Sequence, residues 1–254
     1  MEENALHFDT HSGIYSDVRP GYPNEVYETI SKYKLFNKNS NILEIGSGNG
    51  IASQEIYNKW QPKLTLIEPG NNLHNLLKDR FNKNGGIKIY NTSFEEYNNE
   101  AVFDAIFSAT AFHWCDIKTK YKKVHALLKN DGILILYWNN YGIEDEETYK
   151  EIQNIYVKYG KGRKDGKSVC EMQMEQIENR KREIEESGCF EILEHKIIKT
   201  VKEYDGNDYI KLIKTFSDHG KLNDKFFSEI NAIIKNENEI KVRIVVNLEI
   251  ARKI

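Results

Sequence analysis

Residues 41–50 of the chain read Asn-Ile-Leu-Glu-Ile-Gly-Ser-Gly-Asn-Gly. The first five residues predict a short apolar strand, and the glycines that follow predict a tight turn that opens a helix. Glycine is needed in such a turn because a backbone without Cβ bends sharply and lets a ligand lie against the peptide plane. We therefore interpret the segment as the first strand and the ligand-binding loop of a sheet.

The charge beside this loop restricts its ligand. Glu44 precedes Gly46 by two positions, and a carboxylate so close would repel a phosphate but would suit a cationic group. This favours a nucleoside with little negative charge, and S-adenosylmethionine (SAM) is the leading candidate. A dinucleotide-binding Gly-x-Gly-x-x-Gly turn would need glycine where Ile51 stands. A nicotinamide or flavin is thereby disfavoured, and a purely structural turn is the remaining alternative.

Length and composition bound the class of protein. The chain has 254 residues and a formal net charge of -3, which fits one sizeable domain without the basic footprint of a nucleic-acid-binding protein. Three cysteines without metal or redox spacing predict free thiols and no metal site. The polar, acidic N-terminus and the lack of a run of about 18 apolar residues predict a cytoplasmic protein without a membrane span. A monomer is the default expectation and a homodimer the alternative.

Apolar strand patterns alternate with amphipathic helical patterns over the first 140 residues. Strands are expected at residues 41–45, 63–68, 86–91, 103–108 and 133–138, and helices at 22–30, 51–60, 71–81 and 117–128. Strands this apolar are buried on both faces, and their alternation with helices predicts a parallel sheet with right-handed crossovers.

The pattern changes after Trp138. Residues 139–167 are polar with one expected helix, and a helix at 172–187 is expected to end at Gly188. Strands at 190–203 and 241–251 flank two helices, 206–216 and 223–235, which adds an antiparallel edge to the sheet and a helical cap at one end. We expect a single domain over residues 1–254. Its core comprises 36–140, 172–204 and 240–254, and its cap or lid segments are 1–22, 141–171 and 205–237.

Ligands of an open parallel sheet bind beyond the carboxyl ends of the strands, so candidate residues should follow strands. Glu68 ends the second strand, where an acid can accept hydrogen bonds from both ribose hydroxyls, and Pro69 fixes its direction. Phe94 can flank an adenine ring while Ser93 bonds its edge, although core packing of Phe94 is equally compatible. His113 follows the fourth strand among aromatic residues, where a role in the reaction and a surface position are both open.

In order and spacing these motifs resemble class I SAM-dependent methyltransferases, especially the methyltransferase type 11 group related to trans-aconitate methyltransferase. The matching segments are 43–50 (LEIGSGNG), 66–69 (LIEP), 103–108 (FDAIFS), 111–114 (AFHW) and 127–132 (LLKNDG), with further similarity at 19–23 and, more loosely, 209–252. The resemblance covers nearly the whole chain. It implies a doubly wound, seven-stranded, mostly parallel Rossmann-like sheet with one antiparallel strand near the edge and a helical cap.

The resemblance also implies a set of cofactor-binding residues. Glu44 and the following turn would face the methionine part of SAM, Glu68 the ribose, and Ser93 with Phe94 the adenine. Relatives often have an acid where Ser93 stands, so the contact with the adenine amino group is expected to be weaker or to come from Glu95. The full set of expected contacts is Glu44, Gly46, Ser47, Gly48, Glu68, Pro69, Ser93, Phe94, Ser108 and Phe112.

Relatives use an N-terminal segment as a lid, which makes Tyr15, Arg19 and Tyr22 candidates for contact with the SAM carboxylate or the methyl acceptor. Arg19 as a plain surface residue is the alternative. Methyl transfer is an in-line displacement that depends mainly on alignment and desolvation. His113 is the candidate base for a hydroxyl or ammonium acceptor, whereas Arg19 would orient a carboxylate acceptor.

The expected function is therefore methyl transfer from SAM to an oxygen, nitrogen or carboxylate of a small molecule. Three alternatives remain open. A methyltransferase acting on RNA or protein would need a basic face or a recognition domain, and the sequence shows neither. No residue in the sequence excludes a regulator that binds SAM without catalysing methyl transfer. A nicotinamide oxidoreductase is disfavoured by Ile51.

Overall fold

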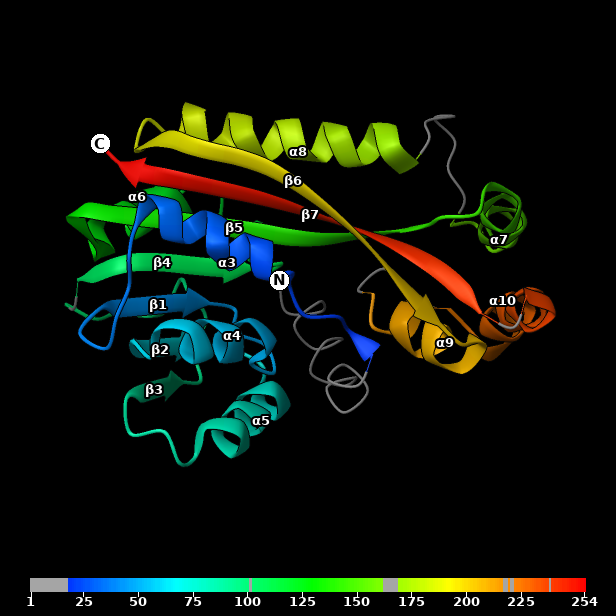
Figure 1. Ribbon diagram of the computed structural model, residues 1–254, viewed down its shortest axis with the longest axis horizontal. Coiled ribbons are helices and arrows are strands. Elements are labelled where there is room, and N and C mark those ends of the chain that lie inside the picture. Colours follow the sequence, from blue (N-terminus) through cyan, green and yellow to red (C-terminus); the bar gives the residue numbers. More distant parts are fainter. Residues whose placement is uncertain (1–17, 101, 162–168, 217–218, 220–221, 238) are drawn as a thin grey trace.

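The computed structural model describes residues 18–100, 102–161, 169–216, 219, 222–237 and 239–254. Over these residues one seven-stranded sheet forms in the order β3-β2-β1-β4-β5-β7-β6 (Figure 1). The strands from β3 to β5 are parallel, and β7 runs antiparallel to both of its neighbours, β5 and β6. The predicted mostly parallel sheet with one antiparallel strand next to the edge is thus confirmed.

The element bounds are as follows. The strands are β1 (Asn41–Ile45), β2 (Lys63–Ile67), β3 (Ile87–Tyr90), β4 (Phe103–Ala109), β5 (Leu128–Ile143), β6 (Phe190–Tyr204) and β7 (Ile240–Lys253). The helices are α3 (Asn24–Tyr33), α4 (Ile51–Trp60), α5 (Asn71–Phe81), the 3-10 turn η1 (Phe112–Trp114), α6 (Lys120–Leu127), α7 (Glu146–Lys158), α8 (Val169–Glu186), α9 (Gly206–Lys214) and α10 (Asp224–Glu237).

The extent of β5 corrects the sequence-based expectation. The apolar run 133–138 predicts a short strand, but β5 continues to Ile143 because β7 pairs with it from Ile133 to Ile143. Polar residues such as Asn139 take part because the ladder hydrogen bonds are made by the backbone. The extension carries Asn139 and Tyr141 beyond the ends of the neighbouring parallel strands.

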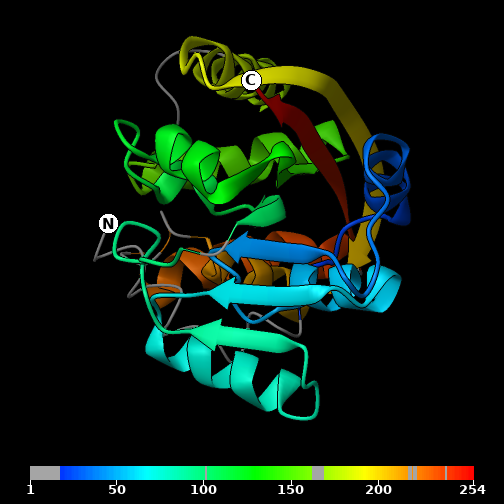
Figure 2. The same cartoon turned by 90° about the vertical axis from the view of Figure 1, so that its left-hand side faces the viewer.

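Helices cover both faces of the sheet (Figure 2). Successive side chains of a strand point to opposite faces, so Ile42 and Leu43 of β1 belong to two different buried clusters. The cluster with Ile42 includes side chains of α3, α4 and α5, and the cluster with Leu43 includes side chains of α6 and α8: Val26, Ile30, Ile56, Leu77 and Phe81 in the first, Val124, Leu127 and Ile184 in the second. Burial on both faces explains the apolar strands.

Helices α7, α9 and α10 form a cap beyond the carboxyl ends of the parallel strands, at the right of Figure 1. The long ends of β5, β6 and β7 reach into this cap. Its apolar side chains belong to the same buried cluster as one face of the sheet, including Ile152, Leu212, Ile230 and Val242. The cap is therefore packed continuously onto the sheet.

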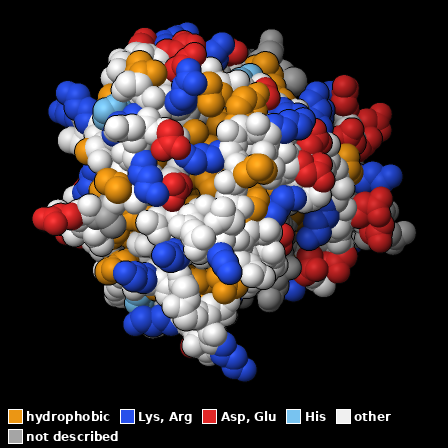
Figure 3. Space-filling model, turned by 60° about the vertical axis from the view of Figure 1, so that its left-hand side comes forward, with side chains coloured by type: hydrophobic (Ala, Val, Ile, Leu, Met, Phe, Trp, Pro, Cys, Tyr) orange, Lys and Arg blue, Asp and Glu red, His pale blue; other side chains and the backbone are white. Residues whose placement is uncertain are grey.

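The surface carries both signs of charge. On the face shown in Figure 3, lysine and arginine side chains are interspersed with aspartate and glutamate. Within the described part of the chain, no helix has the length and apolarity needed to cross a membrane. The same residues contain no cluster of three or more histidine, cysteine, aspartate or glutamate side chains that could hold a metal ion.

Gly50 and Gly188 both have positive φ, so together they test how much steric overlap adds to the cost of backbone strain. Their φ angles are +84° and +63°, but a Cβ on Gly50 would lie 2.9 Å from Leu77 and Phe81, whereas one on Gly188 would meet nothing within 4 Å. We expect Gly188→Ala to lower the free energy of unfolding by about 1 kcal/mol through backbone strain, and Gly50→Ala by about 2–4 kcal/mol because steric overlap adds. Urea unfolding followed by circular dichroism measures both. Equal losses would contradict the contribution of overlap.

Candidate functional site

The loop after β1 is fastened to the end of β2. The backbone N–H groups of Gly46 and Ser47 both donate to the carbonyl of Ile67, at 3.0 and 3.1 Å. Gly46 has φ of +67°, and a Cβ there would lie 2.5 Å from Cβ of Ala111. A Cβ on Gly48 would meet nothing within 4 Å. The loop thus packs closely on the segment after β4 while Gly48 leaves open space beside it.

Glu68 holds two loops with one carboxylate. Its Oε2 accepts a hydrogen bond from the N–H of Gly48 at 2.8 Å, and its Oε1 accepts from the N–H of Gly70 at 2.9 Å. The side chain of Asn91 donates to the carbonyl of Glu68 at 3.0 Å. Glu68 is 6% exposed, so its direction is fixed by the backbone. Because a carboxylate oxygen can accept more than one hydrogen bond, this geometry suits a diol such as ribose.

Two adjoining cavities lie near the loop after β1. The larger of the two has a volume of about 490 Å³ and lies at the carboxyl ends of β1 to β4. Its volume falls within the range of about 300–1,000 Å³ that small-molecule sites occupy. The lining residues come from the segments that follow these four strands: Ile45, Gly46, Gly48, Ile67, Glu68, Pro69, Leu73, Thr92, Ser93, Phe94, Glu95, Glu96, Ala109, Thr110, Ala111, Trp114 and Cys115. Such a wall, largely apolar and with the carboxylate of Glu68 fixed by two backbone N–H groups, fits an adenosine group.

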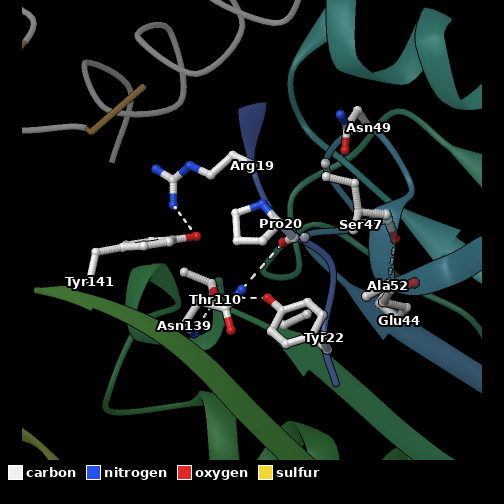
Figure 4. Close-up of a pocket in the computed structure, with 14 residues that line it drawn as sticks. Arg19, Pro20, Tyr22, Glu44, Ser47, Asn49, Ala52, Thr110, Asn139 and Tyr141 are labelled. Atoms are coloured by element: carbon white, nitrogen blue, oxygen red, sulfur yellow. Dashed lines mark hydrogen bonds between the residues drawn. The ribbon is translucent and has the colours of Figure 1, made fainter. Parts of the chain in front are cut away.

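A second cavity of about 50 Å³, the smaller cavity, adjoins the first (Figure 4). Its walls come from the segment before α3 (residues 18–23, the N-terminal arm), the loop after β1 with the start of α4, and the ends of β4 and β5. The lining residues are Arg19, Pro20, Tyr22, Glu44, Gly46, Ser47, Gly48, Asn49, Ile51, Ala52, Ala109, Thr110, Asn139 and Tyr141. Both cavities share Gly46, Gly48, Ala109 and Thr110. They therefore meet where the first loop faces the end of β4.

Glu44 places a titratable carboxyl group in the wall of the smaller cavity. The residue is 1% exposed, and the hydroxyl of Ser53 donates to its Oε2. Burial raises the pKa of Glu44 to about 8, the hydrogen bond from Ser53 opposes this rise, and the negative charge of Glu68 adds to it. The carboxyl is thus largely protonated near neutral pH, and a cation bound beside it would favour the ionised form.

Arg19 ties the N-terminal arm to the cap. Its Nε donates to Oγ1 of Thr215 at 2.8 Å, and a second guanidinium nitrogen donates to the carbonyl of Thr215 at 3.1 Å. The guanidinium carbon lies 5.2 Å from the ring centroid of Tyr141 and 5.0 Å from that of Phe216. Figure 4 shows Arg19 and Tyr141 converging on the same side of the smaller cavity. Cation–π contact and hydrogen bonds thus hold a positive charge at this wall.

Two residues of this wall were not predicted from the sequence. Thr110 has φ of +56°, and its hydroxyl lies 2.9 Å from the hydroxyl of Tyr22. Asn139 is 8% exposed, and among the described residues its Oδ1 has no hydrogen-bond partner. A positive φ at threonine leaves no signal in the sequence, and Asn139 lies in the part of β5 beyond its apolar run. The position of Thr110 just after a strand was the one available indication.

Most of the predicted contacts lie in the walls of the two cavities. Glu68, Pro69, Ser93 and Phe94 line the larger cavity, Arg19, Tyr22, Glu44 and Ser47 line the smaller one, and Gly46 and Gly48 line both. Glu95, the expected substitute for the acid missing at Ser93, also lines the larger cavity. Its Oε1 accepts a hydrogen bond from the N–H of Asp116 at 2.8 Å. Tyr15 lies outside the described residues.

Ser108 and Phe112 require a correction. Ser108 is completely buried, and its hydroxyl donates to the carbonyl of Ile45 at 2.9 Å, which links β4 to β1. Phe112 is 1% exposed and packs edge-on against Tyr121. Neither residue lines a cavity, because the strand end and the η1 turn direct both side chains into the core.

His113 is not among the residues that line either cavity, so the structure does not place it as a base. The residue is exposed, and its Nδ1 accepts a hydrogen bond from Nε1 of Trp138 at 3.1 Å. Desolvation of the ring's packed side and the positive charges of Arg180 and Lys120 lower the pKa of His113 to about 4. A neutral ring is the form that can accept from Trp138, so His113 fixes the η1 turn.

Glu68→Gln tests the role of the fixed carboxylate. We expect the dissociation constant for SAM to rise about 10-fold to 100-fold, because a charged hydrogen-bond acceptor contributes about 1.5–3 kcal/mol. Isothermal titration calorimetry measures this constant. Glu96→Gln is the matched control, since Glu96 lines the same cavity but bonds to Ser93 instead of the first loop. Equal affinities of the two variants would contradict the assignment.

Comparisons with known proteins find similar sequences and a similar fold. A family model described as a methyltransferase domain matches residues 42–132. A probable SAM-dependent methyltransferase of Saccharomyces cerevisiae is 26% identical over 155 residues, which cover 59% of this chain and 52% of that protein. The chain thus spans about half the length of this relative. A malonyl-[acyl-carrier protein] O-methyltransferase of Calditerrivibrio nitroreducens is 30% identical over 119 residues, 46% of this chain and 45% of that protein.

A solved structure shares the fold. A candidate type II methyltransferase from Anaeromyxobacter dehalogenans superposes with a TM-score of 0.65 at 13% identity, over 92% of this chain and 97% of that one. The family model covers every residue that lines the larger cavity, whereas Arg19, Pro20, Tyr22, Asn139 and Tyr141 of the smaller cavity lie outside it. In strand order, in loop geometry and in these matches, the chain is similar to the class I SAM-dependent methyltransferases.

Proposed function

We propose that the protein transfers the methyl group of SAM to a carboxylate oxygen of a small organic acid. The observation that carries this proposal is the pair of adjoining cavities, one suited to adenosine and the other lined by an arginine. When bound, SAM supplies an electrophilic methyl group on a positively charged sulfur. The residues of the chain have to bind and orient both partners and exclude water.

The cofactor side follows from the larger cavity. Glu68 accepts from the ribose hydroxyls, while Phe94 and Trp114 provide apolar walls for the purine. The loop with Gly48 permits close approach of the ligand, since no atom stands within 4 Å of a Cβ built there. Glu44, in the smaller cavity, faces the methionine ammonium group. A cation rather than a phosphate beside Glu44 is the electrostatic reason to favour SAM.

The acceptor side follows from the wall formed by the N-terminal arm and the cap. Arg19 provides a positive charge beside two stacked aromatic rings, Tyr141 and Phe216, and arginine pairs well with carboxylates. A carboxylate acceptor is already ionised at neutral pH and needs no general base. Among the described residues that line the smaller cavity, Glu44 is the sole carboxyl group, and His113 lies outside. The malonyl O-methyltransferase relative supports the same acceptor chemistry.

The bond that forms identifies the acceptor class. We expect SAM labelled in its methyl group to yield a product with malonyl thioesters or short dicarboxylic acids, together with S-adenosylhomocysteine. Mild alkali should release this label as methanol, because a methyl ester hydrolyses whereas an N-methyl group or methyl ether does not. Amines and phenols serve as comparison acceptors. An alkali-stable product would contradict carboxylate methylation, and the lack of product with every acceptor would contradict methyl transfer to these classes.

Variants of Arg19 and His113 separate orientation from base catalysis in the same assay. Arg19→Lys keeps the charge but loses the planar stacking and paired donors, so we expect KM for the acceptor to rise about tenfold. His113→Gln should change kcat less than threefold, since its ring lies outside the cavities. A large kcat loss in His113→Gln at unchanged SAM affinity would restore the base hypothesis.

The raised pKa of Glu44 predicts a pH dependence of cofactor binding. Below a pKa of about 8 the free protein holds Glu44 protonated, so binding of an ammonium beside it must release a proton. Affinity for SAM should therefore rise from pH 6 to pH 8, by about tenfold or more, and level off above that. Calorimetry over this range measures it, and Glu44→Gln should remove most of the dependence. A flat profile in the unmodified protein would contradict the coupling.

A further inference from the structure

Thr110 is held in a conformation that threonine rarely adopts. Its φ of +56° lies in the left-handed region, which is sterically unfavourable for a β-branched residue. Glycine or asparagine would adopt this conformation more easily. Among the described residues, Gln61 and Thr110 are the non-glycine residues with positive φ. Gln61 ends a helix, whereas Thr110 lies in the walls of both cavities.

Three hydrogen bonds hold Thr110 in place. Its N–H donates to the carbonyl of Tyr137 at 2.8 Å. The N–H of Asn139 donates to its Oγ1 at 3.3 Å, and its hydroxyl and that of Tyr22 lie 2.9 Å apart. The N-terminal arm and β5 therefore fix the hydroxyl from opposite sides, and Figure 4 shows Tyr22 pointing at Thr110.

The hydroxyl keeps one hydrogen-bonding position for a ligand. A threonine hydroxyl has one hydrogen and two lone pairs. Its contacts with Asn139 and Tyr22 use two of these three positions, whichever of the two hydroxyls is the donor. The third position is either a donor or an acceptor at the junction of the two cavities. An oxygen of the methyl acceptor can meet it there.

We propose that Thr110 positions the methyl acceptor: its hydroxyl, fixed by Tyr22 and Asn139, bonds the acceptor group at the junction of the two cavities and aligns the reacting oxygen with the methyl donor. This inference rests on the proposed function. Holding the reacting oxygen within about 3–3.5 Å of the methyl carbon lowers the activation barrier and so raises the rate. It also explains a strained threonine at this junction, since a role confined to the turn would be served better by glycine.

Three substitutions separate the effect of the backbone strain at Thr110 from the effect of its hydroxyl group. Thr110→Gly relieves the strain and removes the hydroxyl, Thr110→Val keeps β-branching but removes the hydroxyl, and Thr110→Ser keeps the hydroxyl. Each variant is assayed for kcat and KM with the alkali-labile methyl product of malonyl thioester or dicarboxylic acid. Affinity for SAM is measured separately by calorimetry, and stability by urea unfolding.

We expect Thr110→Gly to be at least as stable as the unmodified protein yet to lose tenfold or more in kcat. Thr110→Val should lose a similar factor, and Thr110→Ser should stay within threefold, with SAM affinity of all three within threefold. Retained kcat in Thr110→Gly and Thr110→Val would overturn the positioning role. A clear loss of stability in Thr110→Gly would overturn the assigned strain. No product from the unmodified protein would instead overturn the proposed function, and the role of Thr110 with it.

Discussion

The site depends on one buried carboxylate that joins the ends of two strands. Glu68 accepts from the backbone of Gly48 in the first loop and of Gly70 in the second. The carbonyl of Ile67 holds the same first loop through two further bonds. The loop after β1 therefore owes its shape to the end of β2 rather than to its own side chains.

Much of the fold could be predicted because its signals are local. The bounds of β1, α4 and α5 match the expected ranges, since glycine turns and helical periodicity mark both ends of these elements. The length of β5 was underestimated because its polar end is held by the backbone of β7. Pairing between segments about 100 residues apart leaves no mark on either segment alone. The late strand pair around two helices predicted an antiparallel edge, and the resemblance to a family placed one antiparallel strand next to that edge.

Site residues could be predicted from the sequence where the rule holds that ligand-binding residues follow directly after a strand. Glu44, Glu68 and Phe94, which this rule selects, line the two cavities. Ser108 and Phe112, which it also selects, do not line them, because the strand end and the η1 turn direct their side chains into the core. It also overvalued His113, because a histidine among aromatics has the same sequence pattern whether it faces a ligand or a tryptophan. Thr110 was missed because its distinctive property is a backbone angle, which other segments impose.

The two cavities differ in how far apart in the sequence their lining segments lie. The larger cavity is formed by loops that each follow directly from a strand of the parallel sheet. The smaller cavity needs the arm, the end of β5 and the cap together: Arg19 bonds Thr215, and the hydroxyl of Tyr204 donates to the carbonyl of Val18 at 3.0 Å. Substitutions in the arm or the cap can therefore reshape the acceptor wall while the bonds of Glu68 stay intact. This separation explains physically why the cofactor can be inferred from a short motif whereas the acceptor cannot.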